Sequence, residues 1–197
     1  CAMPVLAASY FFNRDNKPII WTLCALFILG CRDGLVLIIA GIAIEQAFRK
    51  RWRWFVLASF ISIGYFCILT FLFYPFLKAS FTGEVGATEG ALISFSGFLS
   101  NPLFELAKVD FLGGFIYLLL ISLAFLPFWR KNSLPTLSAW IPLALLNFIA
   151  QNPSYRTLIH HYNLPIALIG VISIVDALSI SGHYKFIWQK LFWVSLC

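Results

Sequence analysis

Two adjacent charged residues, Arg32 and Asp33, stand between two apolar runs, Ile19–Gly30 and Leu35–Ile44. Ionisable groups at membrane depth are costly, so by default they mark a functional site. An arginine can hold a phosphate through two parallel N–H bonds, and a recessed carboxylate can act as a general base or a metal ligand. A structural alternative stays open, because Asp33 can cap the helix that follows and Arg32 can reach out to lipid phosphates.

A second group of chemically active side chains lies in the segment QNPSYRTLIHHYN, residues 151–163. Together, Arg156, His160, His161 and Tyr162 can grip a phosphate or position a proton transfer. Adjacent residues cannot both face one way on a helix, so a site here needs only one of the two histidines. The alternative for this segment is a solvated loop with interfacial aromatic residues.

Both groups belong to a chain with the composition of a membrane protein. Its 197 residues are 61% hydrophobic and only 11% charged, whereas a soluble domain carries about 25% charged residues. The mean hydropathy is +0.88. The net charge of +6 does not indicate a nucleic-acid partner, because the basic residues form short clusters between apolar runs. That pattern is typical of cytoplasmic loops beside a lipid bilayer.

The spacing of the basic clusters predicts an all-α, polytopic transmembrane bundle forming a single domain. The clusters are Arg14 with Lys17; Arg49, Lys50, Arg51 and Arg53; Arg130 with Lys131; and Lys185 with Lys190. If all four are cytoplasmic, six crossings separate them, at about Pro18–Cys31, Gly34–Ala47, Trp54–Phe76, Phe111–Trp129, Leu134–Ala150 and Leu164–Ser181. Residues 31–34, 77–110 and 151–163 then lie outside the cytoplasm, with a short interfacial helix in the second of these segments. Partial helices at both ends, Cys1–Phe12 and Phe186–Cys197, make us expect a fragment of a longer chain.

The first two crossings are short, at about 21 Å each against a hydrocarbon core of about 30 Å. The turn between them, CRDG, is therefore expected to lie below the outer surface, covered by protein or water. In the fifth crossing, Pro142 predicts a kink, because it has no N–H to donate.

Other polar residues have simpler interpretations. Asp110 and Asn163 can cap the helices that they precede, and Glu45 is four residues from Arg49, the spacing of a helical ion pair. Asp176 lies within an apolar run and can pair with Lys185 or with nearby serine hydroxyls. A transport role for this acid is an alternative. The five cysteines show no CxxC or Cys/His spacing, so they predict neither a disulfide framework nor a Cys/His metal site.

The stretch from CRDGLVLIIAGIAIEQAFRKRWRW to YPF resembles a family of polytopic prokaryotic membrane proteins, domain of unknown function 2079. In that family a short charged element, a basic residue followed by Glu or Asp and then Asp, opens a short helix. A basic cluster and a long helix ending in an aromatic-Pro element follow. Here Arg32 stands where the first acid of the element would be. The later stretches SNPLFELAKV and LLNFIAQNPSYRTLIHHYNLPIALIG, with the element His161, Tyr162 and Pro165, are similar to the C-terminal part of such proteins.

The family is similar to the GT-C class of glycosyltransferases, whose members take a sugar from a polyprenyl-phosphate donor at the extracytoplasmic face. The resemblance implies that Arg32 and Arg156, with His160 and Tyr162, bind the donor phosphate. It implies that Asp33 and His161 orient the acceptor or a divalent cation. The acid usual in the first outer loop of that class would precede Cys1, so the fragment alone is expected to be inactive. A transporter or flippase and a non-catalytic scaffold are the alternatives.

Overall fold

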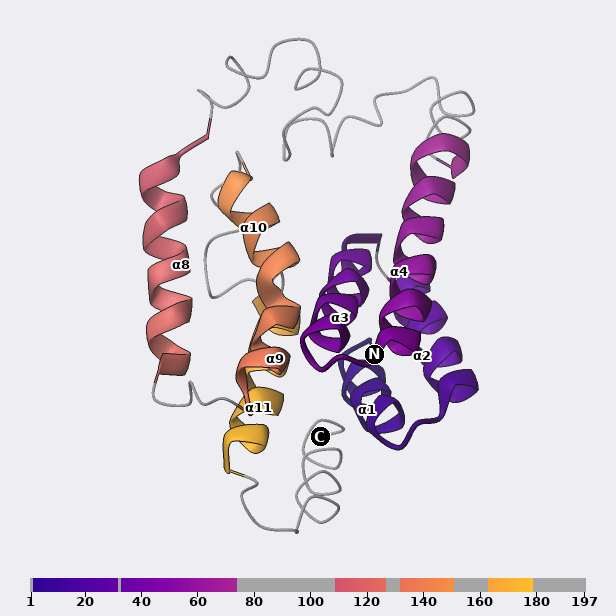
Figure 1. Ribbon diagram of the computed structural model, residues 1–197. Helices are drawn as coiled ribbons and strands as arrows, with labels where there is room; N and C mark the ends of the chain where they lie inside the picture. Colours follow the sequence, from indigo (N-terminus) through magenta and orange to yellow (C-terminus); the bar gives the residue numbers. More distant parts are fainter. Residues whose placement is uncertain (1, 32, 74–108, 127–131, 151–162, 179–197) are drawn as a thin grey trace.

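Figure 1 shows a computed structural model of the chain, of which we describe residues 2–31, 33–73, 109–126, 132–150 and 163–178. These residues form α-helices with short 3-10 and π-helical segments, and no β-strand occurs among them. The expected all-α class is therefore confirmed. The interfacial helix predicted within 77–110 and the partial helix Phe186–Cys197 lie outside the described residues.

The N-terminal half consists of α1 (Ala2–Arg14), α2 (Pro18–Cys31), a 3-10 turn (Asp33–Leu35), α3 (Val36–Phe48) and α4 (Trp52–Cys67), which ends in a π-helical segment (Ile68–Phe73). Helix α2 begins at Pro18, where the missing N–H costs no helical hydrogen bond. Two tight turns connect α1 to α2 and α3 to α4. They use Asn16 and Lys50 in the left-handed conformation, with φ of 60° and 58°.

The C-terminal half consists of α8 (Phe111–Phe125), α9 (Leu134–Leu137), a 3-10 turn (Ser138–Trp140), α10 (Ile141–Ile149) and α11 (Leu164–Leu178). Asp110 caps α8 as predicted, since its Oδ1 accepts a 2.9 Å hydrogen bond from the Gly113 N–H. At Pro142, where a kink is predicted, the helix is interrupted by the 3-10 turn Ser138–Trp140 immediately before the proline. The Ser138 carbonyl, four residues before Pro142, accepts from the Ile141 N–H, because proline has no N–H to donate.

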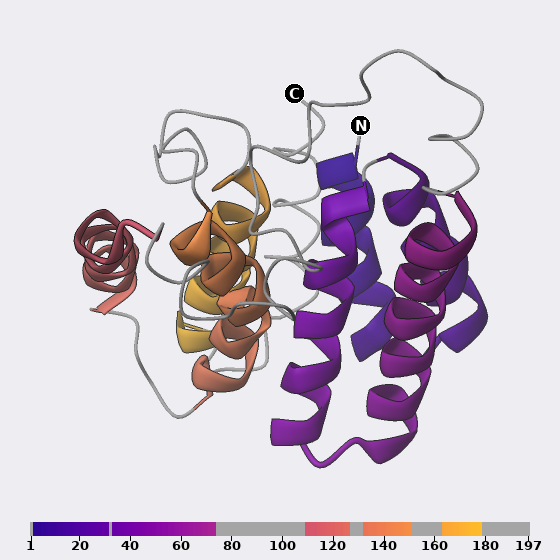
Figure 2. The same ribbon diagram turned by 90° about the horizontal axis from the view of Figure 1, so that it is seen from above.

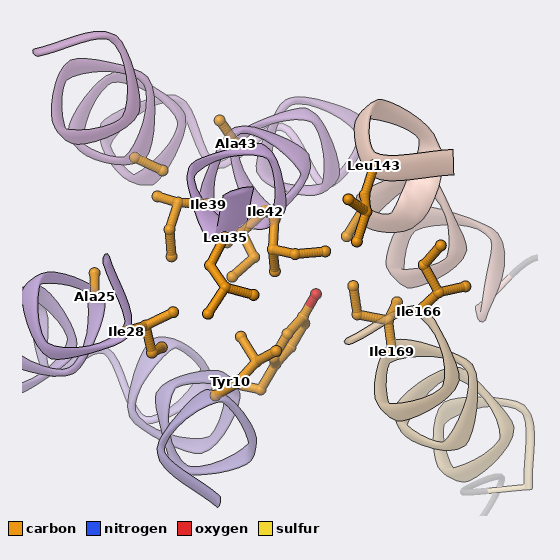
Figure 3. Packing of buried hydrophobic residues seen from close by; sticks show 14 of the residues in the cluster. Tyr10, Ala25, Ile28, Leu35, Ile39, Ile42, Ala43, Leu143, Ile166 and Ile169 are labelled. Carbon is orange, nitrogen blue, oxygen red and sulfur yellow. The ribbon is translucent and has the colours of Figure 1, made fainter. Parts of the chain in front are cut away.

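Helix α3 occupies the centre of the described structure. It lies between α4 on one side and α9 and α10 on the other (Figures 1 and 2). Its buried residues cover more than half of the helix circumference, which is wider than the single apolar stripe of a surface helix. The core seen in Figure 3 joins α3 to helices from both halves, through Tyr10, Ala25, Ile28, Leu35, Ile39, Ile42, Ala43, Leu143, Ile166 and Ile169.

The outward faces of α2, α4 and α8 carry large apolar side chains that remain exposed. Ile19 and Phe60 are each 77% exposed and Leu112 is 72% exposed. Such extended apolar surfaces mark contact with a membrane or with another protein. Among the described residues one helix, Trp52–Phe73, is long and apolar enough to cross a bilayer, with 22 residues and an 18-residue window of mean hydropathy 2.3.

The other predicted crossings coincide with apolar helices of 10–17 residues. These are shorter than the roughly 20 residues that a full crossing requires. The structure therefore supports one crossing by length and composition, and it does not confirm the predicted six. Part of the difference lies at the helix ends, because residues 74–76, 127–129 and 179–181 of the predicted crossings lie outside the described residues.

Candidate functional site

The residues predicted to form the site lie mostly outside the described part of the chain, and these are Arg32, Arg156, His160, His161 and Tyr162. Asp33 begins the 3-10 turn before α3. Helix α3 itself follows Leu35, because a 3-10 turn lies between Asp33 and the helix. Capping by the Asp33 side chain stays a prediction. The structure thus shows the elements that hold the predicted site.

The turn at residues 31–34 is recessed relative to α4. Helices α2 and α4 run side by side in the same direction. Near the start of both helices, the Trp21 and Trp54 rings pack edge to face at 5.5 Å. Further along both helices, the Tyr65 hydroxyl donates a 2.7 Å hydrogen bond to the Leu29 carbonyl. This carbonyl is among the last four of α2, which have no helical partner. Beyond Tyr65 the helix continues to Phe73, which is about 10 Å further. The turn therefore ends short of the C-terminal end of α4 (Figure 1).

A buried polar triad holds both ends of the segment that carries Arg156 and His161. The Tyr117 hydroxyl of α8 donates to Asn163 Oδ1 at 2.7 Å, and Asn147 Nδ2 of α10 donates to the Tyr117 oxygen at 2.9 Å. Asn147 precedes the segment and Asn163 follows it, so these bonds fix its two ends beside α8. The side-chain oxygen of Asn163 accepts from other helices here, so the predicted capping of α11 by this side chain stays a prediction.

A cluster of charged side chains and one threonine hydroxyl lies near the other end of α3, with its acids buried. We call it the ion-pair cluster, and it consists of Arg14, Glu45, Arg49, Thr136 and Asp176. Both guanidinium nitrogens of Arg14 donate to the Asp176 carboxylate at 2.5 Å. Arg49 donates to Glu45 at 2.9 Å and to Asp176 at 3.2 Å. The Thr136 hydroxyl donates to Asp176 at 2.5 Å. The cluster therefore joins α1, α3, α9 and α11.

The two acids of the cluster are almost fully buried, with Glu45 1% and Asp176 4% exposed. Each faces an arginine, so two positive and two negative charges neutralise one another. This balance favours a structural tie, because a binding or transport site needs a charge left for its ligand. Helix α3 separates the cluster from Asp33 by about 18 Å along its axis. The cluster is thus not part of the predicted site.

Arg51 connects the end of α1 to the start of α4 near the same end of α3. Its guanidinium donates to the Asn13 backbone carbonyl at 2.8 Å and to the Asn13 side chain at 3.1 Å, and it lies over the Trp54 ring at 5.3 Å. Burial, and next the charge of Arg49, lower the pKa of the Arg51 guanidinium from its ordinary value. Within the described ranges, no three His, Cys, Asp or Glu side chains gather closely enough to hold a metal.

Comparison with known families gives a match over the whole chain. The family described as "Predicted membrane protein (DUF2079)" matches residues 1–197. The chain belongs to this family. No curated protein and no solved structure matches it. The family assignment confirms the resemblance drawn from the CRDG and His-Tyr-x-x-Pro elements, and it supports a membrane protein. It names no activity.

In this DUF2079 chain, the sequence predicted one acid–arginine pair of the ion-pair cluster and did not predict the other. The Glu45–Arg49 pair was predicted and is confirmed. Asp176 was expected to pair with Lys185 or a serine, but Lys185 lies outside the described residues and the Ser173 hydroxyl donates to the Gly170 carbonyl instead. Arg14 is the partner that was missed. The sequence feature that pointed to such a partner is a single acid within an apolar run. A buried acid of this kind needs a cation as its partner, but the run does not identify that cation.

Proposed function

We propose that this chain is part of a membrane-embedded glycosyltransferase-like protein that uses a polyprenyl-phosphate-linked sugar at the extracytoplasmic face of the plasma membrane. The observation that carries the proposal is the recessed turn at residues 31–34, pinned by the bond from Tyr65 to Leu29. A lipid-linked donor keeps its hydrocarbon chain in the bilayer. A charged turn that stops short of the end of α4 can be reached sideways by the phosphate of such a lipid.

The donor phosphate is bound by the basic side chains of two segments. Arg32 and Arg156 each offer paired N–H donors, and His160 and Tyr162 add further hydrogen bonds. When the glycosyl bond breaks, negative charge grows on the leaving phosphate. Donors already in place stabilise that charge in the transition state, and this is where the arginines contribute to the rate.

Asp33 and His161 act on the acceptor that receives the sugar. A carboxylate and an imidazole beside the reacting carbon can orient an acceptor hydroxyl and receive its proton. The same two side chains can hold a divalent cation.

The packing of the described residues supports bringing these two segments together. Leu35, which closes the turn after Asp33, and Ile166, which follows the His161 segment, are 4% and 2% exposed and belong to one core (Figure 3). The triad joins Asn163, which follows the second segment, to Tyr117 near the middle of α8. Both segments thus adjoin the same core, and the ion-pair cluster lies toward the C-terminal end of α3.

The sidedness of this arrangement can be tested at the natural thiol of Cys31, which is exposed. In a variant that retains only this cysteine, a small membrane-impermeant methanethiosulfonate should label Cys31 in intact cells. In a matched variant whose single cysteine is Lys50→Cys, labelling should require permeabilised cells, because the basic cluster is cytoplasmic. Labelling of both thiols from the same side contradicts the proposed topology.

The catalytic proposal is tested by replacing Arg32 with glutamine in the protein as its host produces it. Reconstituted wild-type protein should convert at least one of a set of polyprenyl-phosphate hexoses, radiolabelled in the sugar, to a product that leaves the lipid phase. Arg32→Gln should slow this conversion about 100-fold or more, as removal of one transition-state donor does. Arg130→Gln, in a predicted cytoplasmic cluster, is the matched control and should keep the wild-type rate.

Other outcomes of the same assay would identify the alternatives. Uptake or lipid flipping by the proteoliposomes without a glycan product favours a transporter. Wild-type conversion by Arg32→Gln removes Arg32 from the site. Absence of both conversion and flux across the whole set favours a scaffold.

A further inference from the structure

A small pocket opens where the turn between α1 and α2 meets the start of α4. Its volume is about 180 Å³, and its lining residues are Asn16, Pro18, Arg53, Trp54 and Leu57. We call it the rim pocket. It lies near the same end of α3 as the ion-pair cluster and is separate from the site proposed for sugar transfer.

The polar side of the rim pocket is preorganised to donate hydrogen bonds. Asn16 Oδ1 accepts from the Trp54 indole N–H at 2.7 Å and from Arg51 at 3.3 Å. Because its oxygen is engaged twice, the Asn16 amide nitrogen is the group that remains to donate to a ligand. Arg53 lines the pocket with a guanidinium, which offers only donors.

The charge around the rim pocket is positive. Lys50, Arg51 and Arg53 follow one another closely in the chain, and Lys17 lies on the neighbouring turn. The nearest acid of this turn, Asp15, sits 3.7 Å from Lys17 and offsets that charge. No carboxylate of the described residues pairs with Arg53 or Lys50. An anion therefore meets an attractive potential here, and its charge is not already supplied by the protein.

The other side of the rim pocket is apolar and opens toward exposed hydrophobic surface. Leu57 is one turn beyond Arg53 on α4, and Phe60 is the next residue along the same face. Phe60 is 77% exposed, and Trp52 at the start of the helix is 62% exposed. Tryptophan at such a position is typical of the boundary between headgroups and acyl chains. A ligand that fits must combine an anionic head with a hydrocarbon tail.

We propose that the rim pocket binds the phosphate headgroup of an anionic phospholipid, with an acyl chain lying along Leu57 and Phe60. The phosphate accepts hydrogen bonds from the Arg53 guanidinium and the Asn16 amide. Trp54, held against Asn16 and under Arg51, forms the floor. The site anchors the start of α4, the long apolar helix, at the membrane surface. Basic pockets between membrane helices at this surface are a recurring form of lipid recognition.

The test is native mass spectrometry of the purified protein titrated with phosphatidylglycerol and, separately, with zwitterionic phosphatidylcholine. Wild-type protein should retain phosphatidylglycerol at least tenfold more tightly. Arg53→Gln should weaken this binding about fivefold or more, and Arg53→Lys should restore most of it, because a phosphate near a membrane surface responds mainly to the charge. Arg130→Gln is the matched control, since it removes one arginine from a different basic cluster.

Three outcomes would overturn the proposal. Equal losses in Arg53→Gln and Arg130→Gln would show general attraction to a basic surface. Equal retention of the two lipids would remove the role of the headgroup charge. Displacement of the lipid by millimolar inorganic phosphate would make the pocket a site for free phosphate. Thermal unfolding of each variant is measured in parallel, and exposed Arg53 should be replaceable without a change in the unfolding temperature.

Discussion

Gly41→Ala should destabilise the protein by about 3 kcal/mol or more. Gly41 lies on α3 where that helix crosses the 3-10 turn Ser138–Trp140. A Cβ atom on Gly41 would overlap the carbonyl oxygen of Ala139 and stand 2.7 Å from its carbonyl carbon. Both atoms belong to backbone that is fully buried, so neither can rotate away as a flexible side chain would. The two segments would have to separate, and the core contacts of α3 with α10 would loosen.

The matched control is Gly64→Ala on α4. A Cβ there meets no atom within 4 Å, so only the helical preference of alanine acts, which is worth about 0.5–1 kcal/mol in favour of the variant. Thermal unfolding in lipid nanodiscs, followed by circular dichroism, should show a large drop for Gly41→Ala and none for Gly64→Ala. Wild-type stability of Gly41→Ala would mean that α3 does not approach Ala139 this closely. Small residues at such crossings are a common means of packing membrane helices.

Asp176→Leu should cost about 3–5 kcal/mol, the usual result of removing one partner from a buried ion pair. The substitution leaves Arg14, whose side chain is 24% exposed, facing an apolar group in place of a carboxylate. It also removes one acceptor from Arg49 and from the Thr136 hydroxyl. Arg49 retains Glu45, so the loss falls mainly on the contact between α1 and α11.

A double variant distinguishes two contributions to the stability: the cost of leaving Arg14 without its carboxylate, and the net stabilisation by the Arg14–Asp176 ion pair. Arg14→Met combined with Asp176→Leu leaves the neutral Arg49–Glu45 pair and should recover at least half of the stability lost by Asp176→Leu. Asp15→Leu serves as the control. The Asp15 side chain is one-third exposed and lies 3.7 Å from Lys17, and a surface ion pair of this kind contributes about 0–1 kcal/mol. If the double variant is as unstable as the single one, Arg14 is not the group that Asp176 neutralises.

Local features of this protein were predictable because their causes act within a few residues. Asp110 caps α8, Glu45 pairs with Arg49 one turn away, and the missing N–H of Pro142 interrupts its helix. The apolar helices appear near the predicted positions for the same reason. The shortness of α3 also predicts that the turn before it is recessed. Its 13 residues span a shorter distance than the 22 residues from Trp52 to Phe73.

The candidate site was predictable only as two segments with suitable chemistry. That both adjoin one core depends on the packing of Leu35 and Ile166 and on the bond of Tyr117 to Asn163. These residues are apolar or neutral, and nothing in their spacing along the chain pairs them.

By itself, the sequence determined that the protein is helical, that its helices are apolar and that a charged turn lies between two short ones. Only the tertiary structure decided that Arg14 meets Asp176, 162 residues away, and that Gly41 meets Ala139. The physical reason is that these helices are apolar on every side. Hydropathy therefore does not specify which faces meet, and the choice is made by close packing at small residues and by the neutralisation of buried charges.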